Sequence, residues 1–409
     1  MNPNQDPNFE RRLILAFALS VLLFVLVMPF LAKKSPTPPT PAQKPTPVAT
    51  VSATAPPPPA RPVPTTHSKS AAATKAAATK PAAAVAAAAE VQTVVDTPVF
   101  RVVFSNRGAS VRTWILTQYK DELGKPLDCV DASFSKQFGY PLAFWVSDSG
   151  LRQQLDDALY QVSKSTAPGG DQTITFTWSN GTLKAIKKIT FNSTYITAIQ
   201  SSLTRDGQPI EAALAWQGGF GDRAVPGDFK TEQYFQQSGS GVETTKVSKM
   251  INDATHQGQY DFAGVEDQYF AMAFLPQNSA SLTITTFNNS YQPRLTDATG
   301  NTITNEKVAT IGLAVATGTK NDTRLFVGPK KAQLLASIDP ALREIVNFGW
   351  FSFIAYPLFL WMNWTYVHWI PNYGWAILFL TFVITMATFQ LKMKSQKSMA
   401  KMQALQPKI

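Results

Sequence analysis

The sequence predicts a membrane-anchored, mostly β protein, in which a large antiparallel β-sandwich is flanked by an N-terminal transmembrane helix and by C-terminal helices. Three observations predict this fold class. An uncharged apolar stretch lies near the N-terminus, and short alternating segments fill the middle of the chain. The last sixty residues hold an aromatic-rich stretch, a second apolar stretch and a basic tail, in that order. Apolar stretches of about 20 residues suit a membrane span, and alternation suits half-buried strands.

The N-terminal stretch from Leu13 to Ala32 is long enough to cross a hydrocarbon core of about 30 Å as a helix. A cleaved signal peptide is the alternative reading. Signal segments are shorter, however, and here Lys33 and Lys34 follow without a small-residue cleavage site. We therefore expect residues 1–34 to form a short N-terminus and an uncleaved anchor.

Residues 35–90 consist mainly of Pro, Ala and Thr. The proline-rich half favours extended polyproline-like chain and has few apolar side chains to bury, whereas the alanine-rich half favours transient helix. We expect this segment to be a disordered linker that tethers the domain that follows.

Residues 91–330 are expected to form the sandwich, because short alternating segments recur there with turn residues between them. The clearest pair flanks Asn180-Gly181, a dipeptide that favours tight hairpin turns. In the segment before it, Ile174, Phe176 and Trp178 point to one face and threonines to the other. Other strands are expected at 99–105, 110–116, 182–191, 195–203, 281–287 and 323–328.

The formal net charge is +10, from 37 basic and 27 acidic residues. Of these, 14 basic and 3 acidic residues lie in 1–90 and 392–409, which leaves 23 and 24 in residues 91–391. The excess positive charge therefore lies beside the predicted spans. That position suits contact with anionic membrane lipids and does not indicate a nucleic-acid partner.

Cys129 is the only cysteine, and the three histidines, His67, His256 and His368, lie far apart in the sequence. A single cysteine excludes an intramolecular disulfide, and no His/Cys cluster has the spacing of metal ligands. We expect neither a metal site nor a cofactor.

A helical pattern begins near Lys330, and Asp339 followed by Pro340 is suited to start a further helix. Two arrangements fit the chain after that: a hairpin of two spans, or a surface helix followed by one span. The tryptophan and tyrosine content of residues 348–370 favours a surface helix, because these side chains prefer the headgroup level. The predicted interface anchors are Trp350, Trp361, Trp364 and Trp369.

The basic tail favours the same arrangement. If the N-terminus is cytoplasmic and the sandwich is outside, a single crossing by 373–391 places the five lysines of 392–409 in the cytoplasm. We therefore expect a helical connector and interfacial helix at 331–372, a transmembrane helix at 373–391, and the start of a basic cytoplasmic helix at 392–409.

Several segments resemble the YidC membrane protein insertase family of Gram-negative bacteria. The two specific ones are NFGWFSFIAYPLFLWMNW at 347–364 and SMAKMQALQPKI at 398–409. The others are FSNRGASVRTWILTQYKDELGKPLD at 104–128, GVEDQYFAMAFLP at 264–276 and RLFVGPKKAQLL at 324–335. Together with the order of segments, the likeness covers nearly all of the chain outside the linker.

The resemblance implies a periplasmic β-supersandwich, a shape shared with sugar mutarotases, in a multi-pass protein of the inner membrane with a cytoplasmic N-terminus. It implies a non-enzymatic insertase and chaperone that acts alone or beside the Sec translocon. The implied partners are nascent inner-membrane proteins, Sec translocon subunits and membrane lipids. Met393, Met399 and Met402 among the tail lysines suggest a surface for a client or a ribosome, or ordinary helix packing.

The family's core is a bundle of five spans around a hydrophilic groove. Four of those spans would follow Ile409, so the resemblance implies a C-terminally truncated chain. Family members commonly carry an arginine in the first core span, where this chain has Thr385, and a proline where it has Gln390.

Thr381, Thr385, Thr388 and Lys392 recur at helical spacing and fall on one face of the predicted span. We interpret this stripe as a groove-facing wall that contacts polar parts of a client, with Lys392 supplying positive charge. Alternatively, the threonine hydroxyls bond back to the preceding turn and only pack.

Two other functions stay open from the sequence: a membrane-anchored periplasmic carbohydrate-binding, mutarotase-like domain, and a scaffold that docks translocon subunits. Mutarotase chemistry needs a general acid and a general base. His256, in a polar segment expected to be a loop, is the only histidine of the predicted domain.

Overall fold

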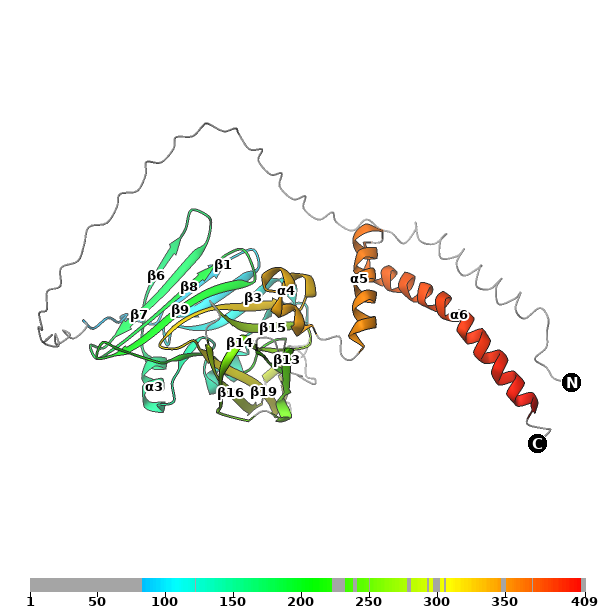
Figure 1. The fold of residues 1–409 in the computed structure, drawn as a ribbon. Coiled ribbons are helices and arrows are strands. Elements are labelled where there is room, and N and C mark those ends of the chain that lie inside the picture. The colour runs from blue at the N-terminus through cyan, green and yellow to red at the C-terminus, as the bar shows by residue number, and fades with distance from the viewer. Residues whose placement is uncertain are drawn as a thin grey trace, which may run out of the picture. The chain divides into compact units, whose positions relative to one another are not determined.

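The computed structural model describes residues 83–409 except for 122, 223–231, 238–240, 250, 278–280, 293, 297–301, 305–306, 347–350, 370 and 406–409. The predicted anchor and most of the predicted linker lie outside the described residues. The described chain comprises a β domain and two long helices, α5 (Ser352–His368) and α6 (Tyr373–Leu405) (Figure 1).

The β domain is built from antiparallel strands in a four-stranded, a fourteen-stranded and a two-stranded sheet. The small sheet has the order β1 (Gln92–Asp96), β2 (Phe100–Ser105), β3 (Ser110–Lys120) and β4 (Pro126–Asp128). The main path of the large sheet has the order β5 (Ala143–Trp145), β11 (Ala213–Trp216), β19 (Val308–Ala316), β16 (Ser281–Tyr291), β14 (Ala254–Glu266), β15 (Phe270–Pro276), β20 (Lys320–Pro329), β9 (Ile196–Arg205), β8 (Leu183–Phe191), β7 (Gln172–Ser179) and β6 (Gln161–Thr166). Off this path lie β10 (Gln208–Ile210), β12 (Glu232–Gln237) and β13 (Gly241–Lys246), and the two-stranded sheet holds β17 (Arg294–Thr296) and β18 (Thr302–Thr304).

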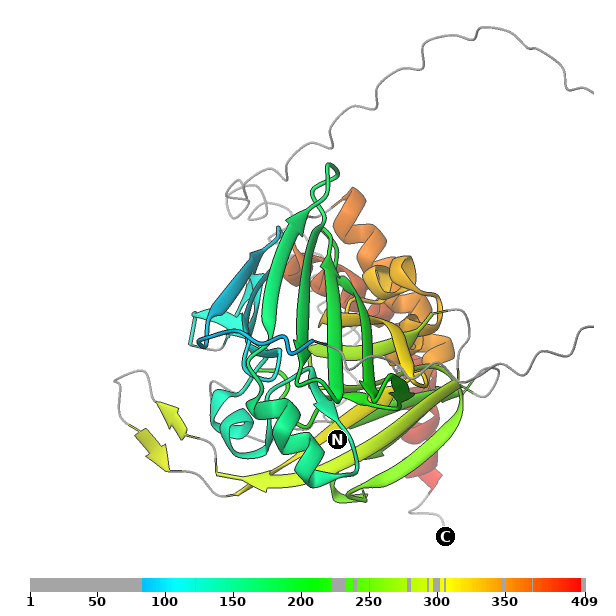
Figure 2. The ribbon, with the colours of Figure 1, turned by 90° about the vertical axis from the view of Figure 1, so that its left-hand side faces the viewer.

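The long strand β14 makes this sheet a sandwich. Its first half, Ala254 to Gln259, pairs with β16, and its last residues, Ala263 to Glu266, pair with β15. A strand shared in this way lets one sheet turn and continue in a second layer. In Figure 2 the yellow-green strands of the β16 layer pass below the upright green strands β6 to β9.

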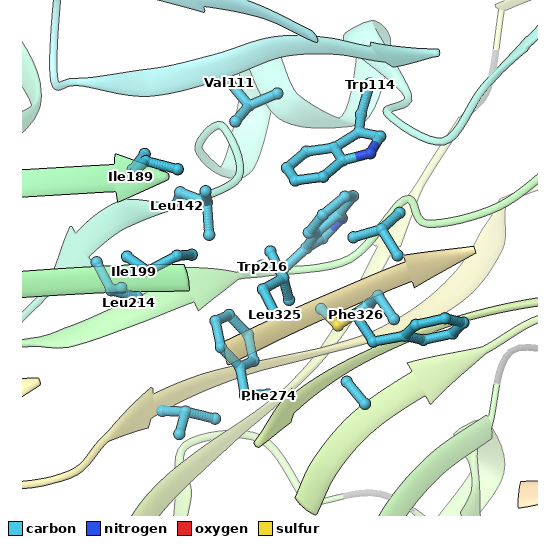
Figure 3. Packing of buried hydrophobic residues seen from close by; sticks show 14 of the residues in the cluster. Val111, Trp114, Leu142, Ile189, Ile199, Leu214, Trp216, Phe274, Leu325 and Phe326 are labelled. Carbon is cyan, nitrogen blue, oxygen red and sulfur yellow. The ribbon is translucent and has the colours of Figure 1, made fainter. Parts of the chain in front are cut away.

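An aromatic core joins the small sheet to the large one. Trp114 of β3 lies 5.9 Å from Phe191 of β8 and 6.2 Å from Trp216 of β11, measured between ring centroids. All three side chains are fully buried, and Figure 3 shows the Trp114 and Trp216 indoles next to each other, with their planes inclined by 46°. Burying rings of this size dominates the stability of such a domain.

The predicted hairpin at Asn180-Gly181 is confirmed. β7 and β8 pair from Gln172–Phe191 to Ser179–Lys184, and Gly181 has the positive φ (96°) that such a turn requires. Ile174, Phe176 and Trp178 are buried, as the alternation predicts.

The structure adds two short helices that the sequence analysis did not predict, α2 (Ala132–Phe138) and α3 (Ser149–Asp157). Each begins after an aspartate whose carboxylate accepts two backbone N–H groups, Asp131 for α2 and Asp148 for α3. The expectation that His256 lies in a loop is wrong, because His256 is in β14 opposite Ile284.

After β20 the chain forms α4 (Ala332–Ile338) and the 3₁₀ turn η2 (Ala341–Ile345). The Asp339 carboxylate accepts the Ala341 N–H at 3.1 Å, but the element that follows is a 3₁₀ turn with Pro340 as its N-cap, where a helix capped by Asp339 was expected. Both elements belong to the core of the β domain, since Leu335, Leu342 and Ile345 are buried in it. At the other end of the described residues, Val85, inside the predicted linker, pairs with Ser179 of the domain.

Candidate functional site in the α5 and α6 helices

Exposed large apolar side chains are concentrated on and beside α5 and α6. In the described part of the β domain, such side chains are Val91, Ile251 and Tyr269. The helical segment exposes Phe351, Phe353, Ile354, Leu360, Trp364, Val367, Trp369, Tyr373, Ile377, Leu378, Ile384, Met386, Phe389, Leu391, Met399 and Met402. An apolar surface of this extent is covered by lipid or by protein in a functioning molecule.

α6 is the one candidate membrane span among the described residues, over Tyr373–Ala400. It is a continuous helix of 33 residues, so the predicted span and the predicted basic segment form one helix. At a rise of 1.5 Å per residue the helix is about 50 Å long, against a hydrocarbon core of about 30 Å. A part of α6 therefore extends beyond the apolar layer if the helix crosses it.

α5 has 17 residues and contains Pro357 in its interior. Its length is about 26 Å, and apolar side chains lie all around it. Its most polar side chains, Asn363, Thr365 and His368, lie toward the C-terminal end. α5 thus lacks the separate polar face of a typical surface helix, and its location at the membrane interface stays a prediction.

The corner between the two helices is a cluster of aromatic rings. The Tyr366 and Tyr373 rings stack with centroids 3.9 Å apart, and Trp369 lies 6.0 Å from Phe379 of α6. The Asn372 side chain accepts the Gly374 N–H at 2.9 Å and thereby caps the start of α6. The predicted break between a first helix and a second one is confirmed at this position.

The structure describes three of the four predicted interface anchors. Trp361 lies 6.5 Å from Phe379, and Trp364 contacts the rings of His368 and Trp369. Trp364 and Trp369 are exposed and Trp361 is half-buried, whereas Trp350 lies outside the described residues.

The predicted polar stripe is present on α6. With 3.6 residues per turn, Thr381, Thr385, Thr388 and Lys392 fall within about 60° around the helix axis and span about 17 Å along it. The three hydroxyls all donate to backbone carbonyls of the preceding turn, to Ile377 at 2.8 Å, Thr381 at 2.7 Å and Ile384 at 2.9 Å. The back-bonding that the sequence analysis kept as an alternative therefore occurs.

The back-bonded threonine hydroxyls can still form hydrogen bonds with another molecule. A hydroxyl has one hydrogen and two lone pairs, so a threonine that donates to its own helix still accepts hydrogen bonds from another molecule. Lys392 follows one turn after Thr388, at the end of the stripe. The stripe offers acceptors along most of its length and one cation at its end.

Sequence reasoning missed a buried polar residue in the β domain, Lys187 of β8. Its Nζ donates to the carbonyls of Ala109, at 2.8 Å, and of Leu142. Burial lowers the pKa of Lys187 to about 7, and the nearby Asp156 carboxylate opposes that lowering. The alternation in β8 indicates that Lys187 is buried, because its side chain lies on the same face of the strand as those of buried Ala185 and Ile189.

Two family models match the chain and together cover nearly all of its described helices and strands. The model of the YidC periplasmic domain matches residues 92–361, and that of the 60Kd inner membrane protein matches residues 364–409. The chain belongs to the YidC family. The first YidC model spans the β domain and most of α5, and the second spans the end of α5 and all of α6.

Curated relatives carry the same family name. The membrane protein insertase YidC of Syntrophus aciditrophicus is 27% identical over 98% of this chain and 73% of its own length. That of Geotalea daltonii is 29% identical over 77% of this chain, and that of Bordetella avium 26% over 78%. This chain covers only 59% and 57% of the latter two proteins.

Among solved structures, YidC from Thermotoga maritima matches at 14% identity and a TM-score of 0.33 over 76% of this chain and 71% of that one. A putative mutarotase from Salmonella typhimurium matches at 9% identity and a TM-score of 0.32, over 59% of this chain and 91% of that one. The fold assignment itself rests on the strands and on the family model.

Proposed function

We propose that this chain acts as a membrane protein insertase and chaperone, which helps to insert, fold and assemble proteins of the inner membrane. The observation that carries the proposal is membership of the YidC family over both the β domain and the helical pair. In this proposal the clients are nascent membrane proteins, and the protein acts alone or with the Sec translocon. A ribosome contacts the basic end of α6.

The proposed topology is multi-pass, with a cytoplasmic N-terminus, a periplasmic β domain and a cytoplasmic end of α6. α5 lies at the outer interface with Trp361, Trp364 and Trp369 as anchors, and α6 crosses once. The exposed apolar side chains of both helices and the lysines that follow Leu391 support this placement.

The proposed client contact is the stripe of Thr381, Thr385, Thr388 and Lys392. A polar client segment inside a bilayer must replace its water hydrogen bonds, and each missing bond costs several kcal/mol. The stripe's lone pairs accept N–H groups of the client, and Lys392 pairs with acidic residues or phosphate. The threonines are assigned the role of acceptors because their hydroxyl hydrogens are already donated to backbone carbonyls of the helix.

The proposal is tested by reconstituting the full chain in liposomes with a translation mixture that makes a single-span client with a short polar translocated tail. Protease protection of the tail measures insertion. We expect insertion above that of empty liposomes, and a severalfold loss in the double variant Thr385→Val with Lys392→Ala. Thr365→Val is the matched control, because Thr365 is also back-bonded, at 2.9 Å to Trp361, but lies on α5. Equal insertion in empty liposomes would contradict the function, and full activity of the double variant would contradict the stripe.

A further inference from the structure

The chain enters the β domain along residues 83–91, which we call the strap. Val85 exchanges two backbone hydrogen bonds with Ser179 at the end of β7, each 2.8 Å long. Two residues later, the Ala87 N–H donates to the carbonyl of Leu159 at 2.9 Å. The strap is therefore fixed to the β domain along its length, before β1 begins.

Asn106, in the turn between β2 and β3, holds the other end of the strap. Its side chain accepts the Val91 N–H at 2.7 Å and donates to the Ala89 carbonyl at 3.0 Å, and its backbone N–H donates to the Val91 carbonyl at 3.1 Å. The same buried amide also donates to the carbonyl of Tyr160, which precedes β6. One side chain thus joins the strap to the corner where the small sheet meets the large one.

Glu90 supplies the strap's charged contact. Its carboxylate accepts hydrogen bonds from the Ser105 hydroxyl at 2.6 Å, Arg107 Nε at 2.9 Å and Arg112 Nη2 at 3.3 Å. The hydrogen bonds from Ser105 and Arg107 hold the pKa of Glu90 below its ordinary value of 4.5. Glu90 is therefore ionised at neutral pH and binds three donors of β2, β3 and the turn between them.

Little apolar surface holds the strap in place. Between Ala83 and Glu90, Val85 and Ala87 are half-buried and the other residues are exposed. Attachment by hydrogen bonds and partly exposed ion pairs is weak compared with a hydrophobic core. A segment of this kind opens locally at much lower free energy than the whole domain unfolds.

We propose that the strap can detach from the β domain and reattach to it, and that its state sets the length of the predicted linker. Glu90 is the residue that keeps the strap closed. When closed, the strap fixes the linker's exit at the corner formed by β6, β7 and the β2–β3 turn. When open, it adds residues 83–90 to the predicted linker, which extends the reach of that linker by about 26–29 Å. The length of chain between the predicted anchor and the first fixed residue of the β domain then depends on whether the strap is closed or open.

Hydrogen–deuterium exchange of the full chain in nanodiscs, read by mass spectrometry, tests the proposal. In the wild-type protein we expect the amides of 83–91 to be protected relative to an unstructured peptide. Glu90→Gln should speed their exchange at least tenfold, while peptides of β8 keep their protection. Asp96→Asn is the matched control, because Asp96 makes an exposed ion pair with Arg101 at 3.6 Å, outside the strap. This variant should leave the strap unchanged.

Arg107→Gln provides a second variant that removes one of the three donors to Glu90. It should speed exchange of the strap less than Glu90→Gln does, because Ser105 and Arg112 still donate. Three results would overturn the proposal: wild-type strap amides that exchange like a free peptide, equal protection in Glu90→Gln, or loss of β8 protection together with that of the strap.

Discussion

Lys187 shows how a single polar residue organises the interior of the β domain. Its side chain is fully buried, and its Nζ lies 4.5 Å from the centroid of the Phe144 ring. The two residues whose carbonyls it binds, Ala109 and Leu142, both have positive φ, 47° and 63°. Non-glycine residues rarely adopt this conformation, so the lysine fixes two costly turns in place.

We predict that Lys187→Met destabilises the β domain by about 2 kcal/mol at alkaline pH, because two buried carbonyls lose their donor. The loss should be smaller near neutral pH, since the pKa of Lys187 is about 7 in the folded protein and 10.5 ordinarily. Between these values the unfolded lysine holds a proton that the folded lysine has released, so raising the pH stabilises the wild type. Urea unfolding followed by near-ultraviolet circular dichroism, at about pH 6.5 and about pH 9.5, measures both effects.

The neighbouring Lys188 is the control for this prediction, because it lies on the opposite face of β8 and is exposed. Lys188→Met should change the stability little at either pH. Parallel pH profiles of the wild type and Lys187→Met would show that Lys187 is charged in the folded domain, against the prediction.

At the residue scale, the sequence predicts which side chains point into the core better than it predicts the hydrogen bonds that those side chains form. Strand parity predicts that Ile174, Phe176 and Trp178 are buried, and they are. The same parity places Lys187 inside, but its acceptors lie 45 and 78 residues away in the sequence and depend on the tertiary fold. The back-bonding of Thr381, Thr385 and Thr388 is local, and sequence reasoning anticipates it as an alternative.

At the scale of elements, α5 and α6 allow a direct test of the predicted topology. Ser193→Cys, in the exposed turn between β8 and β9, should react with a membrane-impermeant thiol reagent added from the periplasmic side. Ser398→Cys, in the basic part of α6, should react only after the inner membrane is opened, because a single crossing leaves the lysines in the cytoplasm. The native Cys129 is buried and gives a low background. Labelling of both positions from outside would favour the hairpin of two spans.

Element type was predictable where a local pattern is strong. The two strands that flank Asn180-Gly181, the turn between them and the break near Pro371 follow from alternation, turn chemistry and apolar length. The short helices α2 and α3 have 7 and 9 residues, too few for a helical period to emerge. Their signals are single capping aspartates, which also occur in ordinary turns.

At the scale of the molecule, domain boundaries were the least predictable feature, because they depend on distant contacts. The predicted linker runs to residue 90, but Val85 already pairs with Ser179, which lies 94 positions further along the chain. The predicted sandwich stops at residue 330, but α4 and η2 place Leu335, Leu342 and Ile345 in its core. Neither contact has a counterpart in the local pattern of the sequence.

The boundary at residue 346 leads to a prediction for fragments of the chain. Leu335, Leu342 and Ile345 are each at most 2% exposed, and burying such a side chain contributes about 1.5–3 kcal/mol. Their loss removes roughly 5–9 kcal/mol, as much as the whole stability of many domains. We expect residues 83–346 to give a soluble monomer with cooperative thermal unfolding, and residues 83–330 to aggregate, as read by size-exclusion chromatography and circular dichroism. The fragment 92–346, which lacks the strap but keeps the core, is the control and should fold. A soluble and cooperative 83–330 fragment would show that α4 and η2 only cover a core that is complete without them.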